Sequence, residues 1–325
     1  MDSIKKLLGS ICIFGFDGTS TPDLIKKMIQ EWNLGGVIFF KRNIESKEQV
    51  KELIREVKSY SSQIPLFVSV DHEGGRVFRL PPPFTQIPPA RQVAQENNTF
   101  EVGKLMGREL REVGFNLNYA PVLDVDSNPA NPIIGDRSFG SDPQSVIQHA
   151  LELARGLRSE GIIPCGKHFP GHGDTAKDSH LELPVVDRSL QSLEQIELPP
   201  FQSAIQDHIE MLMSAHVLYP ALDSDWPATL SPKILTGLLR EKMGYEGLII
   251  SDDFNMKAIA DHYGLGEAAR LFLEAGGDIP LICRGEESEW EVLEYLEKAL
   301  SNGSLNLSKV EKASQRVLKL KQKYL

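Results

Sequence analysis

Residues 211–253, MLMSAHVLYPALDSDWPATLSPKILTGLLREKMGYEGLIISDD, contain the repeating unit that decides the fold. Short apolar runs at residues 211–216 and 248–251 stand at its ends, and each has the length of a buried strand. Between them Ser231 and Pro232 open a segment whose apolar residues recur with the spacing of a helix face, at Ile234, Leu235, Leu238 and Leu239. A strand, a helix and a second strand in this order predict a parallel βαβ unit.

The same alternation of apolar runs and amphipathic helical patterns extends along all 325 residues. Eight strands that alternate with helices predict an α/β fold whose parallel sheet closes into a TIM-type (β/α)8 barrel. No low-complexity linker or block of like charge divides the chain, so we expect residues 1–325 to form a single barrel domain. The expected strands are residues 11–16, 36–40, 66–70, 117–123, 162–166, 211–216, 248–251 and 279–283.

A doubly wound open sheet is the main alternative to the closed barrel. It would favour a glycine-rich phosphate loop after an early strand, and neither GxGxxG nor GxxxxGK[ST] occurs. A barrel instead gathers its active site on the loops that follow the strands. Reactive side chains do follow six of the eight apolar runs, namely Asp71-His72-Glu73, Asp124, Lys167-His168, His216, Asp252-Asp253 and Arg284. This pattern favours the barrel.

The charge and cysteine content limit the partners and the compartment. The chain has 35 basic and 45 acidic residues, a net charge of −10, which disfavours a broad surface for nucleic acid or anionic membranes. We therefore expect a small or neutral substrate. No apolar run reaches the roughly 18 residues that a membrane span needs. Three cysteines stand far apart in apolar segments without a CxxC pair, which predicts reduced core residues and a cytoplasmic location: Cys12, Cys165 and Cys283.

The N-terminus allows two interpretations. Lys5 and Lys6 precede the apolar run 7–16 as they would in a short signal peptide. No small-residue cleavage site follows, and the run ends in the segment 15–19, GFDGT. We therefore favour a buried first strand followed by a turn.

Residues 167–180, KHFPGHGDTAKDSH, hold the densest group of reactive side chains, with three histidines, two aspartates and two lysines. Asp178 and His180 are two residues apart, so a local turn would let the carboxylate hold one imidazole nitrogen while the other faces a substrate. A single histidine in a loop is more often solvated or structural. The Asp178–His180 pairing and the two further histidines favour an acid/base dyad.

Asp252 directly follows the seventh apolar run, where a barrel would present its carboxylate to the site. The alternative for an acid after a strand is a helix N-cap. We assign that lesser role to the adjacent Asp253, which would point elsewhere.

Two further clusters carry polar candidates. Asp71 could accept hydrogen bonds from hydroxyl groups of a ligand, and its alternative is a buried ion pair with Arg76 or Arg79. Arg137, in the segment 135–139, GDRSF, either binds a hydroxyl or carboxylate bidentately or holds its own loop in place.

At these residues the sequence resembles glycoside hydrolase family 3, specifically its β-N-acetylglucosaminidase branch. The resemblance runs essentially end to end. The block 167–173, KHFPGHG, with its downstream DSH at 178–180 is highly specific. The segments 71–77, 135–139 and 251–256 would be weak alone.

The resemblance implies hydrolysis of terminal β-linked N-acetylglucosamine with retention of configuration. Asp252 would attack the anomeric carbon, and His180, oriented by Asp178, would protonate the leaving group. His180 would then activate water against the covalent glycosyl-enzyme, where most retaining glycosidases use a second carboxylate. The resemblance also implies which side chains bind the N-acetylated sugar: Asp71, Arg79, Arg137, Lys167 and His168.

The sequence departs from the family pattern at one position. The resemblance also implies a natural substrate. We expect glutamine more often at position 72, so His72 is expected to alter the pocket rim without touching the chemistry. The single-domain length resembles cytosolic members that recycle cell-wall fragments, which implies N-acetylglucosaminyl-anhydromuramyl-peptides as substrate. No metal or organic cofactor is implied.

Four other functions stay open at this point. Lys167 at a strand end would suit a Schiff-base aldolase. A phosphorylase would pass the sugar to phosphate, which a histidine acid/base does not repel, and a non-catalytic sugar-binding barrel would keep the rim alone. A metal-dependent hydrolase would draw its zinc ligands from His168, His172, Asp174, Asp178 and His180, although their spacing fits no standard metal pattern.

Overall fold

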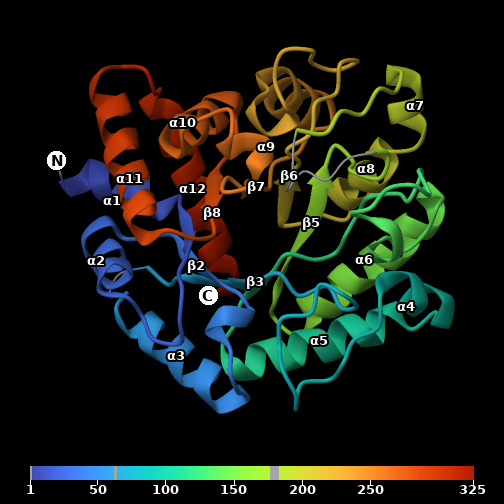
Figure 1. The fold of residues 1–325 in the computed structure, drawn as a ribbon, viewed down its shortest axis with the longest axis horizontal. Coiled ribbons are helices and arrows are strands. Elements are labelled where there is room, and N and C mark those ends of the chain that lie inside the picture. The colour runs from blue at the N-terminus through green and yellow to red at the C-terminus, as the bar shows by residue number, and fades with distance from the viewer. Residues whose placement is uncertain (1, 62–63, 176–182) are drawn as a thin grey trace.

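Eight parallel strands close into a barrel in chain order, with β1 paired to both β2 and β8 (Figure 1). The computed structural model describes residues 2–61, 64–175 and 183–325. The closed ring of eight parallel strands confirms the predicted TIM-type barrel. The strands are β1 (Ile13–Gly15), β2 (Gly36–Phe39), β3 (Phe67–Val70), β4 (Leu117–Asn118), β5 (Ile163–Phe169), β6 (Met211–Ser214), β7 (Leu248–Asp253) and β8 (Ile279–Ile282).

Helices surround this barrel, as Figure 1 shows, and their apolar faces cover the strands. The α-helices are α1 (Asp2–Ser10), α2 (Asp23–Trp32), α3 (Lys47–Ser59), α4 (Ala90–Glu96), α5 (Thr99–Val113), α6 (Pro143–Ser159), α7 (Leu190–Gln195), α8 (Leu198–Gln206), α9 (Lys257–Ala260), α10 (Leu265–Ala275), α11 (Glu286–Ser301) and α12 (Leu307–Tyr324). The short 3₁₀ helices are η1 (Lys41–Asn43), η2 (Gly135–Arg137) and η3 (Ala228–Leu230), and η4 (Lys233–Lys242) is a π-helix.

The βαβ unit at residues 211–253 forms as its periodicity predicts. Helix η4 lies between β6 and β7, and the Ser231 hydroxyl accepts a hydrogen bond from the Ile234 amide at its start (3.1 Å). The four apolar residues of its predicted face are all buried: Ile234, Leu235, Leu238 and Leu239. Burial of this stripe against the barrel drives the packing of the helix.

Each predicted strand overlaps an observed one, although most bounds differ by at least one residue, and the ends of β4, β5 and β7 bear on the site. Strand β4 has two residues instead of seven, and beyond it only Val122 bridges to β5, at Lys167. Strand β5 continues to Phe169 because Lys167 and Phe169 pair with β6, and β7 continues to Asp253. The reactive residues predicted to follow the fifth and seventh strands therefore lie within the strands, on a backbone held by ladder hydrogen bonds.

The N-terminal apolar run is divided between a helix and a strand. Residues up to Ser10 belong to α1, and only Ile13–Gly15 of the predicted strand 11–16 is extended. A Cβ atom on Gly9 would lie 1.9 Å from the Trp32 carbonyl oxygen, so α1 packs directly on the end of α2. The sequence pattern does not reveal this close backbone contact, which requires glycine at position 9.

The cysteines are buried free thiols, as predicted, at Cys12, Cys165 and Cys283. Within the part of the chain that the structure describes, no helix has both the length and the apolar character needed to cross a membrane.

Candidate active site

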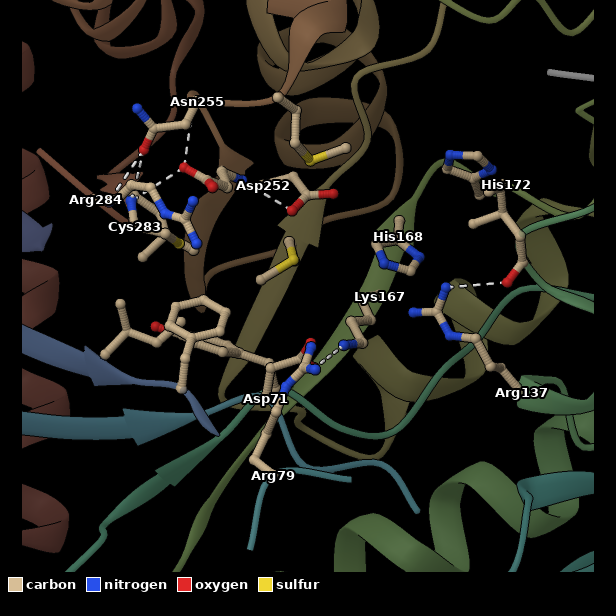
Figure 2. A pocket seen from close by; sticks show the side chains of 18 of the residues that line it. Asp71, Arg79, Arg137, Lys167, His168, His172, Asp252, Asn255, Cys283 and Arg284 are labelled. Atoms are coloured by element: carbon tan, nitrogen blue, oxygen red, sulfur yellow. Dashed lines mark hydrogen bonds and ion pairs between the residues drawn. The ribbon is translucent and has the colours of Figure 1, made fainter. Parts of the chain in front are cut away.

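A cavity of about 480 Å³ opens at the carboxyl ends of the barrel strands (Figure 2). It is lined by all six of the predicted site residues that the structure describes: Asp71, Arg79, Arg137, Lys167, His168 and Asp252. These side chains come from chain segments up to 181 positions apart, and closure of the barrel brings them together. The other two predicted residues, Asp178 and His180, lie outside the described residues.

Asp252 is the penultimate residue of β7, and its carboxylate faces the cavity (Figure 2). The Asp253 amide donates to its Oδ1 at 2.8 Å. The N-cap role that we assigned to Asp253 is wrong, because α9 begins at Lys257 and its capping position is Met256. The Asp253 carboxylate instead accepts the amides of Asn255 and Cys283 (both 3.0 Å) and so joins the loops after β7 and β8.

Lys167 forms the centre of a buried charge network at the end of β5. Its ammonium group pairs with Asp71 and, at 2.5 Å, with Glu73, and its side chain is only 2% exposed. Burial lowers the pKa of Lys167, but the two carboxylates outweigh burial and leave that pKa above its usual value. The amine therefore stays protonated, which disfavours the nucleophilic role that a Schiff-base aldolase requires.

Glu73 is a site residue whose role the sequence did not reveal. The Arg137 guanidinium binds its carboxylate through two parallel hydrogen bonds of 2.8 and 2.7 Å. Burial raises the pKa of Glu73, yet Arg137 and Lys167 outweigh that effect and keep it well below its usual range. Arg137 thus lines the cavity with part of its hydrogen-bonding capacity already used, and Glu73 holds two cations in place at the cavity wall.

Asp71 combines a position at the cavity with an ion pair. It lines the cavity, and its Oδ2 accepts a hydrogen bond from Arg79 at 3.0 Å. The ion pair forms with Arg79, whereas Arg76 lies 3.7 Å from Asp136 and donates to the Ile133 carbonyl. The Oδ1 atom of Asp71 faces Lys167 (Figure 2).

His168 is oriented by Asp124, a second residue whose partner was hidden in the sequence. The Asp124 carboxylate is fully buried and accepts hydrogen bonds from His168 Nδ1 (2.7 Å) and from the His172 amide (2.7 Å). Burial raises the pKa of Asp124, but His168 and His172 together outweigh burial and leave that pKa below its usual value. Because one imidazole nitrogen is held by this carboxylate, the other edge of the His168 ring is directed to the cavity.

His72 does not lie at the pocket rim, which corrects the expectation for this position. Its side chain is buried beside the Phe78 ring, and its Nδ1 accepts the Arg79 amide at 3.3 Å. Burial lowers the pKa of His72 to about 4, so the ring is neutral at physiological pH. It supports the backbone of the Asp71–Arg79 loop from inside.

The turn after β5 is packed tightly onto the loop after β4. A Cβ atom on Gly173 would lie 1.6 Å from the Val125 carbonyl oxygen, so only glycine fits. The Asp174 carboxylate in this turn pairs with Arg188 at 2.5 Å, and His172 Nδ1 lies 2.9 Å from the Thr175 hydroxyl. In the described ranges, no three histidine, cysteine or acidic side chains converge in a manner suited to a metal ion.

Glu197 lies beneath this turn, and its burial leads us to expect a free energy of unfolding that depends on pH. Burial raises its pKa from 4.5 to about 8, helped by Asp124 and Asp174 and opposed by the hydrogen bond from Ser127. Its neutral form therefore favours the folded state, and that contribution is complete below pH 4.5 and lost as the pH rises to about 8. We expect Glu197→Gln to raise the melting temperature at pH 8 by roughly 5 °C more than at pH 5.

Thermal unfolding at the two pH values checks this expectation. Glu101→Gln, which removes an exposed carboxylate, serves as the matched control and should shift the melting temperature equally at both. An equal shift for Glu197→Gln would show that Glu197 is ionised in the folded protein.

The comparisons with known proteins show the family of the chain. The model of the glycosyl hydrolase family 3 N-terminal domain matches residues 9–320. A β-hexosaminidase from Thiobacillus denitrificans is 37% identical over 289 residues, which are 86% of this chain and 80% of that protein. A β-hexosaminidase from Methylococcus capsulatus is 42% identical over 277 residues, 83% of this chain and 82% of that protein.

The barrel also matches a solved family 3 β-N-acetylglucosaminidase from a Paenibacillus species, with a TM-score of 0.95 and 38% identity. That match covers 98% of this chain and 62% of the Paenibacillus chain, so the present sequence spans somewhat less than two thirds of that relative. A family model that covers nearly the whole barrel and relatives of this identity lead to one conclusion: the chain belongs to glycosyl hydrolase family 3.

Proposed function

We propose that this protein is a retaining exo-β-N-acetylglucosaminidase. The observation that carries the proposal is the Asp252 carboxylate, which faces a cavity whose opposite wall holds Asp71, Lys167 and His168 (Figure 2). A carboxylate opposite a group of hydrogen-bonding side chains suits attack on the anomeric carbon of a sugar held by its hydroxyls. The names of the β-hexosaminidase relatives support the same sugar.

The reaction would proceed in two displacements. In the first, an Asp252 oxygen bonds to the anomeric carbon, the glycosidic bond breaks, and the leaving oxygen takes a proton from His180. In the second, His180 takes a proton from water, whose oxygen attacks the same carbon and releases Asp252. Asp178 would hold the His180 imidazole. Two inversions at one carbon give net retention.

The remaining site residues would bind the terminal sugar. Asp71 offers acceptor oxygens to hydroxyl groups, while Arg79, Lys167 and Arg137 supply donors whose charges are balanced by Asp71 and Glu73. His168, oriented by Asp124, would donate or accept at a further hydroxyl. A set of donors and acceptors held this rigidly selects one hydroxyl pattern, because a mismatched sugar would leave buried polar groups unpaired.

We further propose that residues 1–325 act as one catalytic domain and that the natural substrates are muropeptides from peptidoglycan, cleaved in the cytoplasm. The three buried free thiols are compatible with a reducing compartment.

A fluorinated N-acetylglucosaminyl donor tests the proposal directly, because it traps a covalent intermediate. We expect mass spectrometry of the digested protein to find one labelled peptide, with the sugar on Asp252. The first product anomer, followed by NMR with a normal substrate, should be β. A label on another residue, an α product, or glycosyl phosphate formed in phosphate buffer would each exclude this reaction.

A further inference from the structure

One wall of the cavity carries more positive charge than the carboxylates beside it neutralise. The wall consists of Arg42, Lys257 and Arg284, which follow strands β2, β7 and β8, and we call it the basic wall. Figure 2 shows Arg284 on the opposite side of Asp252 from Arg137 and His172. Six basic and only three acidic side chains line the whole cavity, in a protein whose net charge is −10. The excess is therefore local to the site.

The cations of the basic wall differ from those that would hold the terminal sugar. Lys167, Arg79 and Arg137 each have a buried or half-buried carboxylate partner. Lys257 and Arg284 are exposed, and neither forms an ion pair with any residue that the structure describes. Their charges are thus available to a ligand.

Arg42 is held firmly beside them. Its guanidinium stacks on the Phe40 ring at 4.5 Å, donates to the Phe16 carbonyl at 3.1 Å and pairs with Asp17. Burial lowers its pKa, Asp17 raises it, and the nearby charge of Arg284 lowers it again. Two neighbouring guanidinium groups repel each other, and an anion between them would relieve this repulsion.

Asp253 lines the same cavity from β7, and together with Asp17 it sets two carboxylates against the three cations of the basic wall. Its Oδ1 is occupied by the amides of Asn255 and Cys283. Burial raises its pKa to about 6.

The depth of the cavity indicates which part of a substrate meets this wall. An exo-acting enzyme takes the terminal sugar into the enclosed part of its site, here beside the buried Lys167. The rest of the substrate, the aglycone, must extend toward solvent. Lys257 and Arg284 line the cavity and are exposed, so we expect the aglycone to pass beside them as it extends toward solvent.

We propose that Arg42, Lys257 and Arg284 form a subsite for a carboxylate on the aglycone and make the enzyme select acidic aglycones. This inference rests on the proposed glycosidase function and adds to it the residues that read the leaving part of the substrate. The guanidinium of Arg284 and the ammonium of Lys257 bind the carboxylate oxygens, and Arg42 adds a fixed charge behind them.

The test compares two substrates that differ by one charge. They are N-acetylglucosaminyl-β-1,4-anhydro-N-acetylmuramic acid, whose lactyl ether ends in a carboxylate, and its neutral methyl ester. We expect the unmodified enzyme to favour the acid by about tenfold in kcat/KM, mainly through KM. Arg284→Gln should remove most of this preference, and Lys257→Gln should reduce it. Arg108→Gln, which removes an exposed arginine of α5, should keep the full preference.

A third substrate, with a peptide amide-linked to the lactyl group, identifies the source of the carboxylate. If the wall reads the lactyl group, the Arg284→Gln effect disappears with this substrate, and if it reads the peptide, the effect persists. Equal kcat/KM for acid and ester, or an unchanged preference in Arg284→Gln, would overturn the subsite. Failure of the glycosidase proposal is a different result, namely no N-acetylglucosamine from either substrate.

Discussion

Asp252→Ala is expected to lower kcat for release of 4-nitrophenol from its β-N-acetylglucosaminide by at least about four orders of magnitude. The loss is large because the adjacent carboxylate cannot replace it: the side chain of Asp253 is turned to the amides of Asn255 and Cys283. The fold should persist, since Asp252 lies at the open end of β7, and a normal melting temperature would separate loss of chemistry from loss of structure.

Azide offers a sharper test of the same variant. A small anion that enters the space left by the missing carboxylate should restore turnover and give the α-glycosyl azide, because it attacks from the face that Asp252 occupied. Asp261→Ala, which removes an exposed carboxylate just beyond α9, serves as the control and should retain the original rate. Near-normal turnover by Asp252→Ala without azide would remove Asp252 from the mechanism.

Glu73→Gln is expected to cause the largest loss of stability among substitutions at the site. The carboxylate of Glu73 neutralises both Arg137 and Lys167, and all three side chains are largely buried. Removal of one member of a buried ion network leaves uncompensated charge and costs about 3–5 kcal/mol. The melting temperature should therefore fall by roughly 10 °C, since each kcal/mol shifts it by a few degrees in a protein of this size.

The exposed pair of Glu52 and Arg55 on α3 provides the matched control. Both side chains face solvent, so Glu52→Gln should leave the free energy of unfolding almost unchanged. Thermal and urea unfolding of the two variants measure the contrast. Equal small effects would mean that Arg137 and Lys167 find other counter-charges when Glu73 is neutral.

The strands and the helices could be predicted because their signals are local. Apolar runs of strand length and the helical spacing of Ile234, Leu235, Leu238 and Leu239 depend only on near neighbours in the chain. The ends of β4, β5 and β7 could not, because a strand continues for as long as the next strand offers pairing partners. The same limit applies at the N-terminus, where residues 2–10 form a helix that packs on Trp32 through Gly9.

The sequence alone determined which reactive side chains the protein possesses, and it predicted the barrel ends at which they gather. It could not show that Glu73 holds Arg137, 64 positions away, or that Asp124 orients His168, 44 positions away. Only closure of the barrel decided which charges are neutralised and which, at Lys257 and Arg284, still face the cavity. The physical reason is that an ion pair depends on distance in space, whereas a motif records only distance along the chain.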